Sequence, residues 1–405
     1  MTGPRRAWTQ VAVVFATAFA TAIAPAAHAL GLGDTPDSTW SVNGKVYALA
    51  EHGTTLYVGG TFRRAYSPDG TEHVAAANLV ALDETTGAAL TTFSADVEDD
   101  KKMPQVQSLA VSPDGSTLYL GGIFTSVDGT DRRNFAAVDA STGALLDQAP
   151  DLDGPVHAML LVNGDLYIGG QFKHVDDMHR PGVAELAPDG TLVSGWKPNV
   201  RGTVRDLTLA PDGATIFLGG NFSKVDDVAR QSVARVDTLT GALDPWTIPA
   251  GVIESPQTAW DVIPTATRVY VAFGQELNYV AAFRMKQQAQ NAPGSQVWRY
   301  STVGNVESLA LSSDDRLFAG GHFGLAQDQQ QPSGCGGTYV RGLMSSTGPE
   351  QGFTADCDWL PQLAPYGSNH KGAWVMLLAG DELWVGGYFT TIGGVAQSGI
   401  ARFTL

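Results

Sequence analysis

The sequence predicts an all-β fold, namely a seven-bladed β-propeller with four antiparallel strands in each blade. Three observations predict it. A short apolar element ending in Gly-Gly-x-Phe recurs along the 405 residues, its copies begin 48 to 66 residues apart, and turn signals divide each unit into four runs. Repeats of this length with four strands each are typical of propeller blades, whereas horseshoes and β-helices use shorter repeats.

The Gly-Gly element is the second run of each unit. Its copies are apolar on both faces, as in Leu118-Tyr119-Leu120, which favours blades that pack face to face and bury both sides of the sheet. The paired glycines indicate a close approach of two backbones or a bulge. The six clear copies begin at Leu56, Leu118, Leu166, Ile216, Leu317 and Leu383, and a degenerate copy begins at Val269.

Turns mark the other three runs. A turn such as Pro113-Asp114-Gly115 separates the first run from the second, and a turn such as Thr86-Gly87 separates the third run from the fourth. Both are hairpin signals. The fourth run centres on an aromatic residue, and these residues are Phe93, Trp196, Trp246, Trp298 and Phe353.

The two ends of the chain predict how the ring closes. The last unit, Ala373–Leu405, ends after its third run, Gly399–Phe403, and lacks a fourth. A run without a unit of its own, Ser38–Val42, matches the fourth-run pattern around Trp196. We expect residues 38–42 to complete the last blade beside Gly399–Phe403, which would leave no open edge between the first and last blades.

These motifs resemble those of the delta-sixty repeat propellers of secreted bacterial proteins, which are kelch-like and WD40-like in architecture. The resemblance rests on the Leu56–Phe62 and Asn78–Asp83 elements and their copies, and it covers residues 38–405. It implies the propeller fold. It implies no catalytic residues, because the group shares no catalytic set. The fifth unit departs most, since it lacks the Gly-Gly-x-Phe ending and the Thr-Gly turn.

The first 29 residues are typical of a secretory signal peptide. Arg5 and Arg6 precede an apolar run, Val11–Ala24, and Ala27-His28-Ala29 supplies a cleavage site. The run is too short for a convincing membrane span. We therefore expect a signal peptide at 1–29, one propeller domain at 30–405, and a secreted, extracellular or cell-surface protein. The paired arginines leave the twin-arginine export route open beside the ordinary one.

Charge and motifs limit the partners. Loss of the two signal-peptide arginines would change the formal charge from −16 to −18. Nucleic acid and anionic membranes need basic surface, so neither is expected as a partner. The sequence carries no phosphate loop, no His-Glu-x-x-His and no Gly-x-Ser-x-Gly element. We expect no cofactor and no metal.

Cys335 and Cys357 are the two cysteines, and both fall in the sixth unit on either side of a predicted hairpin. In an exported protein such a pair predicts a structural disulfide. The alternative is a pair of free thiols that serve as nucleophile or metal ligands.

One position in the first run varies freely between units while its flanks barely change. We expect these side chains at the mouth of a central channel, where aromatic, acidic, basic and amide groups would suit a sugar or the end of a peptide. The alternative is that they fill the space between blades or are solvated. The seven candidates are Tyr47, Gln107, His157, Arg205, Trp260, Glu307 and Trp374.

Two weaker groups of residues lie in the loops after the second run. Asp128, Asp176-Asp177 and Asp226-Asp227 recur at one step of the repeat, where they would bind Ca²⁺ or cap turns. Turn capping is the commoner role of such aspartates. His174 and His179 lie on one of these loops, at a spacing that indicates no particular site.

The function expected from the sequence is that of a non-catalytic interaction module. Long loops such as Arg63–Ala77 and Gly324–Thr338 gather on one face, and this face would bind an extracellular protein or carbohydrate. The alternative is an extracellular propeller enzyme, a lyase or glycoside hydrolase, that acts at the channel mouth. A glycoside hydrolase needs two carboxylates about 5 to 10 Å apart.

Overall fold

The computed structural model describes residues 35–100, 103–147, 149–253, 257–286, 291–322, 324–325, 343–347, 349–350 and 372–405. The chain divides into Met1–Gly31 and Leu32–Leu405, and every described residue belongs to the second unit. These residues form strands and turns, and no helix that could cross a membrane is among them. The predicted signal peptide (1–29) and the predicted disulfide between Cys335 and Cys357 lie outside the described residues and stay predictions.

Seven sheets within these ranges repeat one order, in which a first strand pairs antiparallel with a second and the second with a third. The first strands are β2 (Lys45–His52), β8 (Gln105–Val111), β13 (Val156–Val162), β18 (Val200–Leu209), β22 (Thr258–Pro264), β26 (Val306–Leu311) and β30 (Ala373–Ala379). The second strands are β3 (Thr55–Thr61), β9 (Thr117–Ile123), β14 (Asp165–Gly170), β19 (Thr215–Val225), β23 (Arg268–Gly274), β27 (Arg316–Gly321) and β31 (Glu382–Gly387). The third strands are β6 (Leu79–Asp83), β12 (Phe135–Asp139), β17 (Val183–Leu186), β21 (Val233–Asp237), β24 (Tyr279–Arg284), β29 (Leu343–Thr347) and β34 (Ile400–Thr404).

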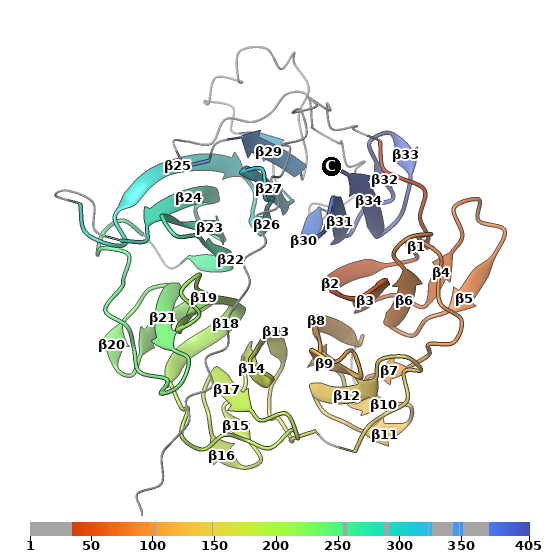
Figure 1. The fold of residues 1–405 in the computed structure, drawn as a ribbon, viewed down its shortest axis with the longest axis horizontal. Coiled ribbons are helices and arrows are strands. Elements are labelled where there is room, and N and C mark those ends of the chain that lie inside the picture. Colours follow the sequence, from red (N-terminus) through yellow and green to blue (C-terminus); the bar gives the residue numbers. More distant parts are fainter. Residues whose placement is uncertain are drawn as a thin grey trace, which may run out of the picture. The chain divides into compact units, whose positions relative to one another are not determined.

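The sheets lie side by side around a common centre, with the first strands innermost (Figure 1). Buried apolar side chains fill the space between neighbouring sheets. One cluster joins the β2–β3 sheet with the β8–β9 sheet and includes Tyr57, Val106 and Leu118. A further cluster, which includes Val46 and Trp384, joins the β2–β3 sheet with the β30–β31 sheet. Because both faces of each sheet are buried, the second strands are apolar without alternation.

The paired glycines stand where backbones approach closely. A Cβ on Gly59 would lie 2.6 Å from Cγ1 of Val106 in the next sheet, and a Cβ on Gly60 would lie 1.9 Å from the carbonyl oxygen of Lys45. Neither position has room for a side chain. The predicted close approach is confirmed, and the bulge lies in the first strand opposite the glycines, between Val46 and Ala48.

The fourth run differs from the prediction of four strands in every blade. In four sheets it keeps one bridge to the third strand, and these bridges are Leu82–Ala89, Val138–Leu145, Leu186–Leu192 and Val236–Leu243. Within the described ranges a full fourth strand, β25 (Gln296–Val303), pairs with β24 and continues to β28 (Gly324–Leu325). The aromatic residue of the run bonds to the next sheet, both where the run leaves the ladder and in β25, where the indole nitrogen of Trp298 donates to the carbonyl oxygen of Pro349. The indole nitrogen of Trp196 donates to the carbonyl oxygen of Asp237 at 3.0 Å.

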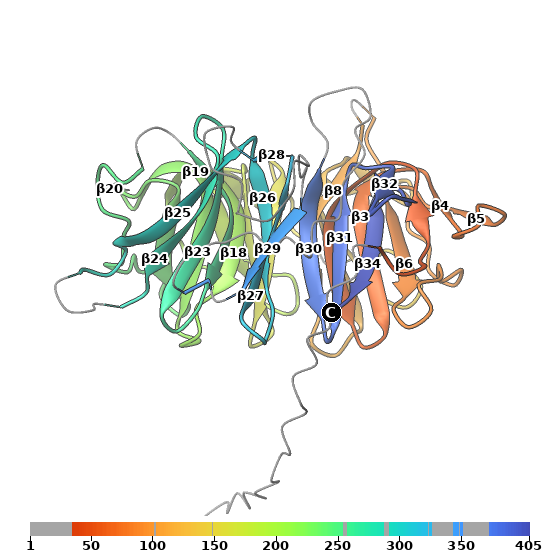
Figure 2. The ribbon, with the colours of Figure 1, turned by 90° about the horizontal axis from the view of Figure 1, so that it is seen from above.

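Short outer strands lie at one end of the sheets. Lys45 at the start of β2 pairs with Thr61 at the end of β3, so the loop that follows β3 lies at the same end as the first residues of β2. In Figure 2, β5 and β32 lie toward the upper end. The outer strands are β4 (Arg64–Tyr66), β5 (His73–Ala75), β7 (Val97–Glu98), β10 (Ser126–Val127), β11 (Thr130–Asp131), β15 (His174–Val175), β16 (Met178–His179), β20 (Val228–Ala229), β32 (Thr391–Ile392) and β33 (Val395–Ala396).

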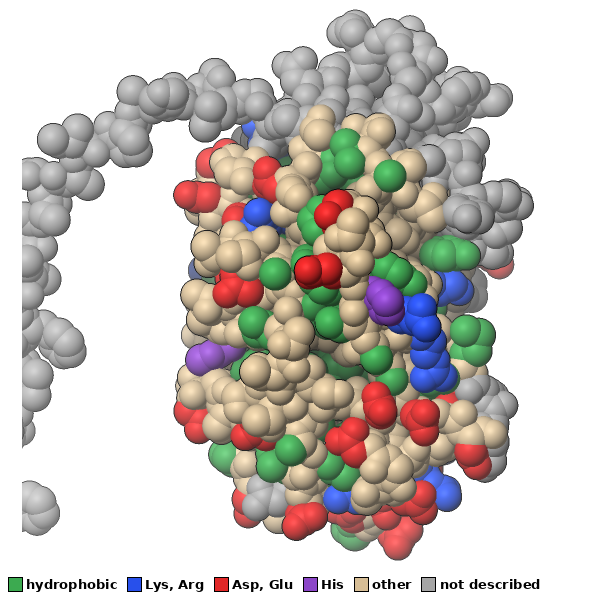
Figure 3. Space-filling model, turned by 90° about the vertical axis from the view of Figure 1, so that its right-hand side faces the viewer, with side chains coloured by type: hydrophobic (Ala, Val, Ile, Leu, Met, Phe, Trp, Pro, Cys, Tyr) green, Lys and Arg blue, Asp and Glu red, His purple; other side chains and the backbone are tan. Residues whose placement is uncertain are grey.

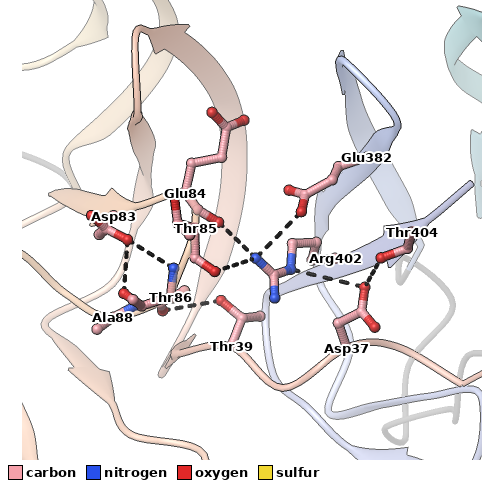
Figure 4. Close-up of polar contacts among 11 residues, drawn as sticks. Asp37, Thr39, Asp83, Glu84, Thr85, Thr86, Ala88, Glu382, Arg402 and Thr404 are labelled. Carbon is pink, nitrogen blue, oxygen red and sulfur yellow. Dashed lines mark hydrogen bonds and ion pairs between the residues drawn. The ribbon is translucent and has the colours of Figure 1, made fainter.

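The N-terminal segment meets the last strand (Figure 4). The backbone N–H of Asp37 donates to the carbonyl oxygen of Arg402 at 2.8 Å, and that of Val42 donates to Ser398 at 3.0 Å. The first sheet makes the same two bonds within one unit, from Leu90 to Ala81 at 2.9 Å and from Val97 to Ala77 at 3.1 Å. The N-terminal segment therefore takes the place, beside the last sheet, that the fourth run takes in the first.

The predicted strand at residues 38–42 differs from the structure in its pairing. Ser41–Val42 form β1, which pairs with β4 of the first sheet instead of with Gly399–Phe403. Strand pairing with β34 is limited to one isolated bridge, Asp37 to Arg402. As in the other sheets, the segment leaves the ladder after one bond, because it crosses to the neighbouring sheet. The N–H of Trp40 and the hydroxyl of Thr39 both donate to the carbonyl oxygen of Gly87.

Candidate functional site

Each innermost strand carries a β-bulge near its start. At a bulge two residues of one strand stand opposite one residue of its partner, and the extra side chain is redirected. The residue before the bulge position is buried in every case, as at Val46, Val106 and Val156. The residues in the bulges are Tyr47, Gln107, His157, Arg205, Trp260, Glu307 and Trp374.

The seven bulge side chains line one cavity of about 310 Å³. They are the seven candidates predicted from the sequence, and the structure brings all of them together. All seven are half-buried. A cavity of this size lies at the lower end of the range for small-molecule sites, roughly 300 to 1,000 Å³. Their role in ligand binding stays a prediction.

Two contacts join side chains of neighbouring sheets across the cavity wall. His157 Nδ1 lies 2.7 Å from Oε1 of Gln107, whose amide nitrogen donates to Oε1 of Gln105. Because the Gln107 oxygen accepts, Nδ1 of His157 carries the proton and Nε2 is an acceptor. The guanidinium of Arg205 lies over the ring of Trp260, 4.7 Å from its centre. This is a cation–π contact.

Aromatic rings form a second part of the wall. Tyr47 and Trp374 stack with ring centres 5.3 Å apart and planes 8° from parallel. Tyr388 lies against Trp374 at 6.0 Å. Nζ of Lys45 lies over both rings, 5.7 Å from the centre of Trp374 and 5.2 Å from that of Tyr388. The stack joins β2 of the first sheet to β30 of the last.

The acidic member of the cavity has a histidine partner. Oε1 of Glu307 lies 3.1 Å from Nδ1 of His322, and both side chains are mostly buried. When His322 is protonated this contact is an ion pair. Glu307 lies between Trp260 and Trp374 in the order of the sheets, so the carboxylate is flanked by two indole rings.

Five polar atoms of these side chains are shielded from solvent and, within the described part of the chain, have no hydrogen-bond partner. Such atoms are rare in native structures and are commonly satisfied by a bound water, an ion or a ligand. Three are donors and two are acceptors. The donors are Nε of Arg205 and Nε1 of Trp260 and Trp374, and the acceptors are Nε2 of His157 and Oε2 of Glu307.

Burial shifts the acid–base properties of the cavity. It lowers the pKa of His157 to about 3, and the charge of Arg205 acts in the same direction. Burial also lowers the pKa of Arg205, against the opposing effect of Glu307. Burial raises the pKa of Tyr47; a bond to Thr61 opposes this and the charge of Glu307 adds to it. At neutral pH the imidazole of His157 is therefore uncharged and the phenol of Tyr47 is protonated.

Two carboxyl groups lie directly behind the cavity wall, one residue after Arg205 and Trp260. Oδ2 of Asp206 accepts the N–H of Val262 at 2.9 Å, and Oδ2 of Asp261 accepts the N–H of Leu309 at 2.7 Å. Each therefore bonds its own sheet to the next. Burial and the charge of Asp261 raise the pKa of Asp206, and burial raises the pKa of Asp261 to about 6.

Sequence reasoning missed three side chains that contact the candidates, namely Lys45, His322 and Tyr388. The signal was present. His322 and Tyr388 occupy the position after the paired glycines, which varies as freely as the bulge position and contains Thr61, Ile123, Gln171, Asn221, His322 and Tyr388. Free variation at both positions indicates that the first strand and the second strand both contribute side chains to the cavity wall.

The weaker candidates have structural roles. Oδ1 of Asp128 accepts the N–H of Asp96 at 2.8 Å, and Oδ1 of Asp226 accepts that of Asn199 at 2.8 Å. Each carboxylate thus bonds the preceding interblade segment instead of capping its own turn, and the described residues contain no group of three metal-binding side chains. His174 and His179 face each other across a hairpin with ring centres 5.6 Å apart.

Known proteins match this chain through their folds. No family model and no curated protein matches its sequence. The extracellular domain of the one component system BT4673 from B. thetaiotaomicron has a TM-score of 0.55 at 12% identity and covers 91% of this chain, which spans 39% of that chain. The WD40 propeller domain of Doa1 has a TM-score of 0.55 at 10% identity, covering 91% of this chain and 96% of its own.

A chain of the mitotic checkpoint complex has a TM-score of 0.57 at 14% identity, covering 98% of this chain and 99% of its own. At such low identity these likenesses show the fold alone. The fold of this chain is all-β and β-propeller-like.

Proposed function

We propose that this protein is an exported, seven-bladed β-propeller, of the kind found in delta-sixty repeat and kelch-like proteins, that serves as a non-catalytic interaction module. It binds a protein or a glycan on the loop-rich face. The binding site is the cavity lined by the seven bulge residues, from Tyr47 to Trp374. Export follows cleavage after residue 29, and Cys335 and Cys357 form a disulfide. N-terminal sequencing of the secreted protein, with Leu30 expected first, tests the export route.

The proposed blade number rests on the repeated order of strands, and the proposed closure rests on contacts between the first and last sheets. A Cβ on Gly386 of the last sheet would lie 2.6 Å from Cγ1 of Val46 in the first sheet. A Cβ on Gly59 would lie at the same distance from Cγ1 of Val106 in the second sheet. The bond from Asp37 to Arg402 repeats the bond from Leu90 to Ala81. In these two contacts the last sheet meets the first in the same way as the first sheet meets its own next neighbour or fourth run, which supports the proposed closure.

One observation carries the proposed binding role: the bulge side chain of every innermost strand lines the same cavity. Their chemistry differs from sheet to sheet while the residues around them repeat. Side chains that only separate the sheets would repeat as their neighbours do. A rigid scaffold with variable groups at one end is the usual basis of a binding surface.

The test is a glycan array and a pull-down screen with the secreted protein, repeated with Trp260→Ala and Trp374→Ala. Each substitution should reduce binding by about tenfold or more, as buried aromatic anchors commonly do. Leu239→Ala is the control, because Leu239 is 85% exposed on a distant turn. Binding that survives both tryptophan substitutions in folded protein would show that the ligand lies elsewhere.

The alternative function, an extracellular lyase or glycoside hydrolase, draws on the joint presence of Glu307, His157 and Arg205 in the cavity. Two features disfavour it. A general base works best with a pKa near the working pH, and burial lowers that of His157 to about 3. Among the described residues that line the cavity Glu307 is the one carboxylate, whereas a glycoside hydrolase needs two. Turnover of any bound glycan would support the enzyme.

A further inference from the structure

The chemistry of the cavity restricts its ligand further, provided that the proposed binding role is correct. Arg205 is the starting point. Its guanidinium rests on Trp260, burial lowers its pKa, and no carboxylate of the described residues lies within ion-pair distance. Arg205 is half-buried and Glu307 acts on it only from beyond ion-pair distance, so the guanidinium is stabilised less than a paired one would be. A ligand that brings an anion would supply the pairing.

The remaining polar atoms need both hydrogen-bond donors and acceptors from a ligand, and an anion alone offers only acceptors. The shielded donors of Trp260 and Trp374 stand in one wall with the shielded acceptors of Glu307 and His157. A hydroxyl group both donates and accepts, so a polyhydroxylated ligand satisfies such a mixed set. A peptide carboxyl terminus offers a single backbone N–H donor beside its carboxylate, whereas the ring of a sugar offers several hydroxyl donors to Glu307 and His157. Because these atoms are shielded from solvent, the inference requires the side chains to rotate so that the atoms face the ligand.

Size and shape agree with a single ring. The cavity of about 310 Å³ is small for a binding site. Its walls include the stacked rings of Tyr47 and Trp374 and the indole of Trp260, which suit the apolar face of a sugar. Lys45 lies beside this wall and adds a second cation.

The net charge of the protein is negative, whereas Arg205 and Lys45 at the cavity are cations. The formal charge is −16, and acidic side chains are spread over the flank seen in Figure 3. An anionic ligand would be repelled at such a surface. We propose that the cavity binds the acidic sugar residue of a glycan, a hexuronate whose carboxylate pairs with Arg205 and whose hydroxyls meet Glu307, His157 and the two indoles.

The experiment measures binding of galacturonate and glucuronate, with neutral galactose and glucose as comparison, to the secreted protein by calorimetry. The hexuronates should bind about tenfold or more tightly than the neutral sugars, since a charge-assisted hydrogen bond is worth about 1.5–3 kcal/mol. Arg205→Gln should remove this difference. Its melting temperature should not fall, because the substitution removes an unpaired buried charge.

Two further variants separate charge from structure. Glu307→Gln should strengthen hexuronate binding about threefold or more, because it removes a carboxylate next to the site. Arg63→Gln is the matched control, since Arg63 is exposed at the same end of the sheets and should leave affinity unchanged.

The outcomes distinguish this inference from the proposed function. If neutral sugars bind as tightly as hexuronates, the inference is overturned while glycan binding stands. If the protein binds a peptide, loses it on substitution of Trp260 or Trp374, and binds no sugar, the inference is overturned. The proposed interaction module then stands. If no ligand depends on Trp260 or Trp374, both fail.

Discussion

Asp206 and Asp261 stand out among the individual residues, because their carboxyl groups accept backbone N–H bonds between sheets and yet ionise reluctantly. A raised pKa in the folded state means that the unfolded chain loses its proton first as the pH rises. For Asp261, with a pKa of about 6, the unfolding free energy therefore falls as the pH rises from about 4 to about 6. These residues stabilise the fold least at neutral pH.

We predict that Asp261→Asn stabilises the protein at neutral pH. The amide oxygen keeps an acceptor for the N–H of Leu309 and removes the cost of a buried charge. The expected gain is about 1–2 kcal/mol, because the backbone N–H bonds to the carboxylate partly offset the cost of its burial. Urea unfolding at pH 4 and at pH 7 measures it, and the gain should be largest at pH 7.

Asp114→Asn is the control of opposite sign. Asp114 lies in an exposed turn, where bonds from Ser112 and Ser116 lower its pKa to about 2. Its stabilising effect is present at neutral pH and is lost as the pH falls toward 2. Asp114→Asn should therefore destabilise the protein at pH 7. If both variants change stability in the same direction, the assignment of the buried pair is wrong.

His157 supplies a second prediction. Its imidazole should show no titration by NMR between pH 8 and pH 5, because burial lowers its pKa to about 3. The unfolded chain binds a proton below pH ~6.5 and the folded chain does not, so unfolding free energy falls as the pH drops, by at most about 1.4 kcal/mol per pH unit. His157→Gln should flatten this dependence. A chemical-shift titration near pH 6.5 would contradict the described burial.

At the scale of the strand, the bulge and the paired glycines depend on each other. The bulge turns Tyr47 toward the cavity, and the carbonyl of Lys45 then fills the place of a side chain at position 60. The same arrangement recurs at Gly122, where a Cβ would lie 1.9 Å from the carbonyl oxygen of Gln105. The Gly-Gly element therefore makes room for the bulge that turns these side chains toward the cavity.

Gly60→Ala should destabilise the protein by about 1–3 kcal/mol or more, as overpacking at a rigid backbone contact does. It should also displace Tyr47 and weaken ligand binding. Gly195→Ala is the matched control, because no atom lies within 4 Å of a Cβ at that position. Thermal unfolding compares the two, and equal melting temperatures would show that the close approach at Gly60 is unimportant.

The strands show what could be predicted from the sequence and what could not. The repeat and the variable position between constant flanks predicted the second strands and all seven cavity residues, because both are periodic patterns. The fourth run was predicted as a strand and is mostly a single bridge. Trp196 and Trp298 both bond to the next sheet, yet only the run of Trp298 stays fully paired, and no local pattern reports this difference. The contact of His322 with Glu307 was missed although His322 stands at a second freely varying position, the one after the paired glycines.

At the scale of the molecule, Arg235 and Arg402 occupy equivalent positions in the third strands of their sheets and contact different segments. Arg235 pairs with Asp244 at 2.7 Å within one unit. Arg402 lies 3.9 Å from Asp37, which precedes the first sheet, and donates to the carbonyl oxygen of Glu84 at 2.6 Å. In Figure 4 the guanidinium of Arg402 stands between the first and last sheets. It thus bonds segments from the two ends of the chain.

Arg402→Ala and Arg235→Ala form a matched pair. Each should lower the unfolding free energy by about 2–4 kcal/mol through lost charged hydrogen bonds. Arg402→Ala should in addition free the N-terminal segment, so limited proteolysis of the native protein should remove residues before Lys45. Arg235→Ala should leave that segment protected. If both variants resist cleavage there, the N-terminal segment does not depend on Arg402.

The most direct test of the account is a crystal structure of the secreted protein grown with galacturonate. The account predicts a closed ring of seven sheets, Asp37 bonded to Arg402, and density for the sugar between Arg205 and Trp374. A different number of sheets, or a sugar bound only on the outer strands, would contradict it.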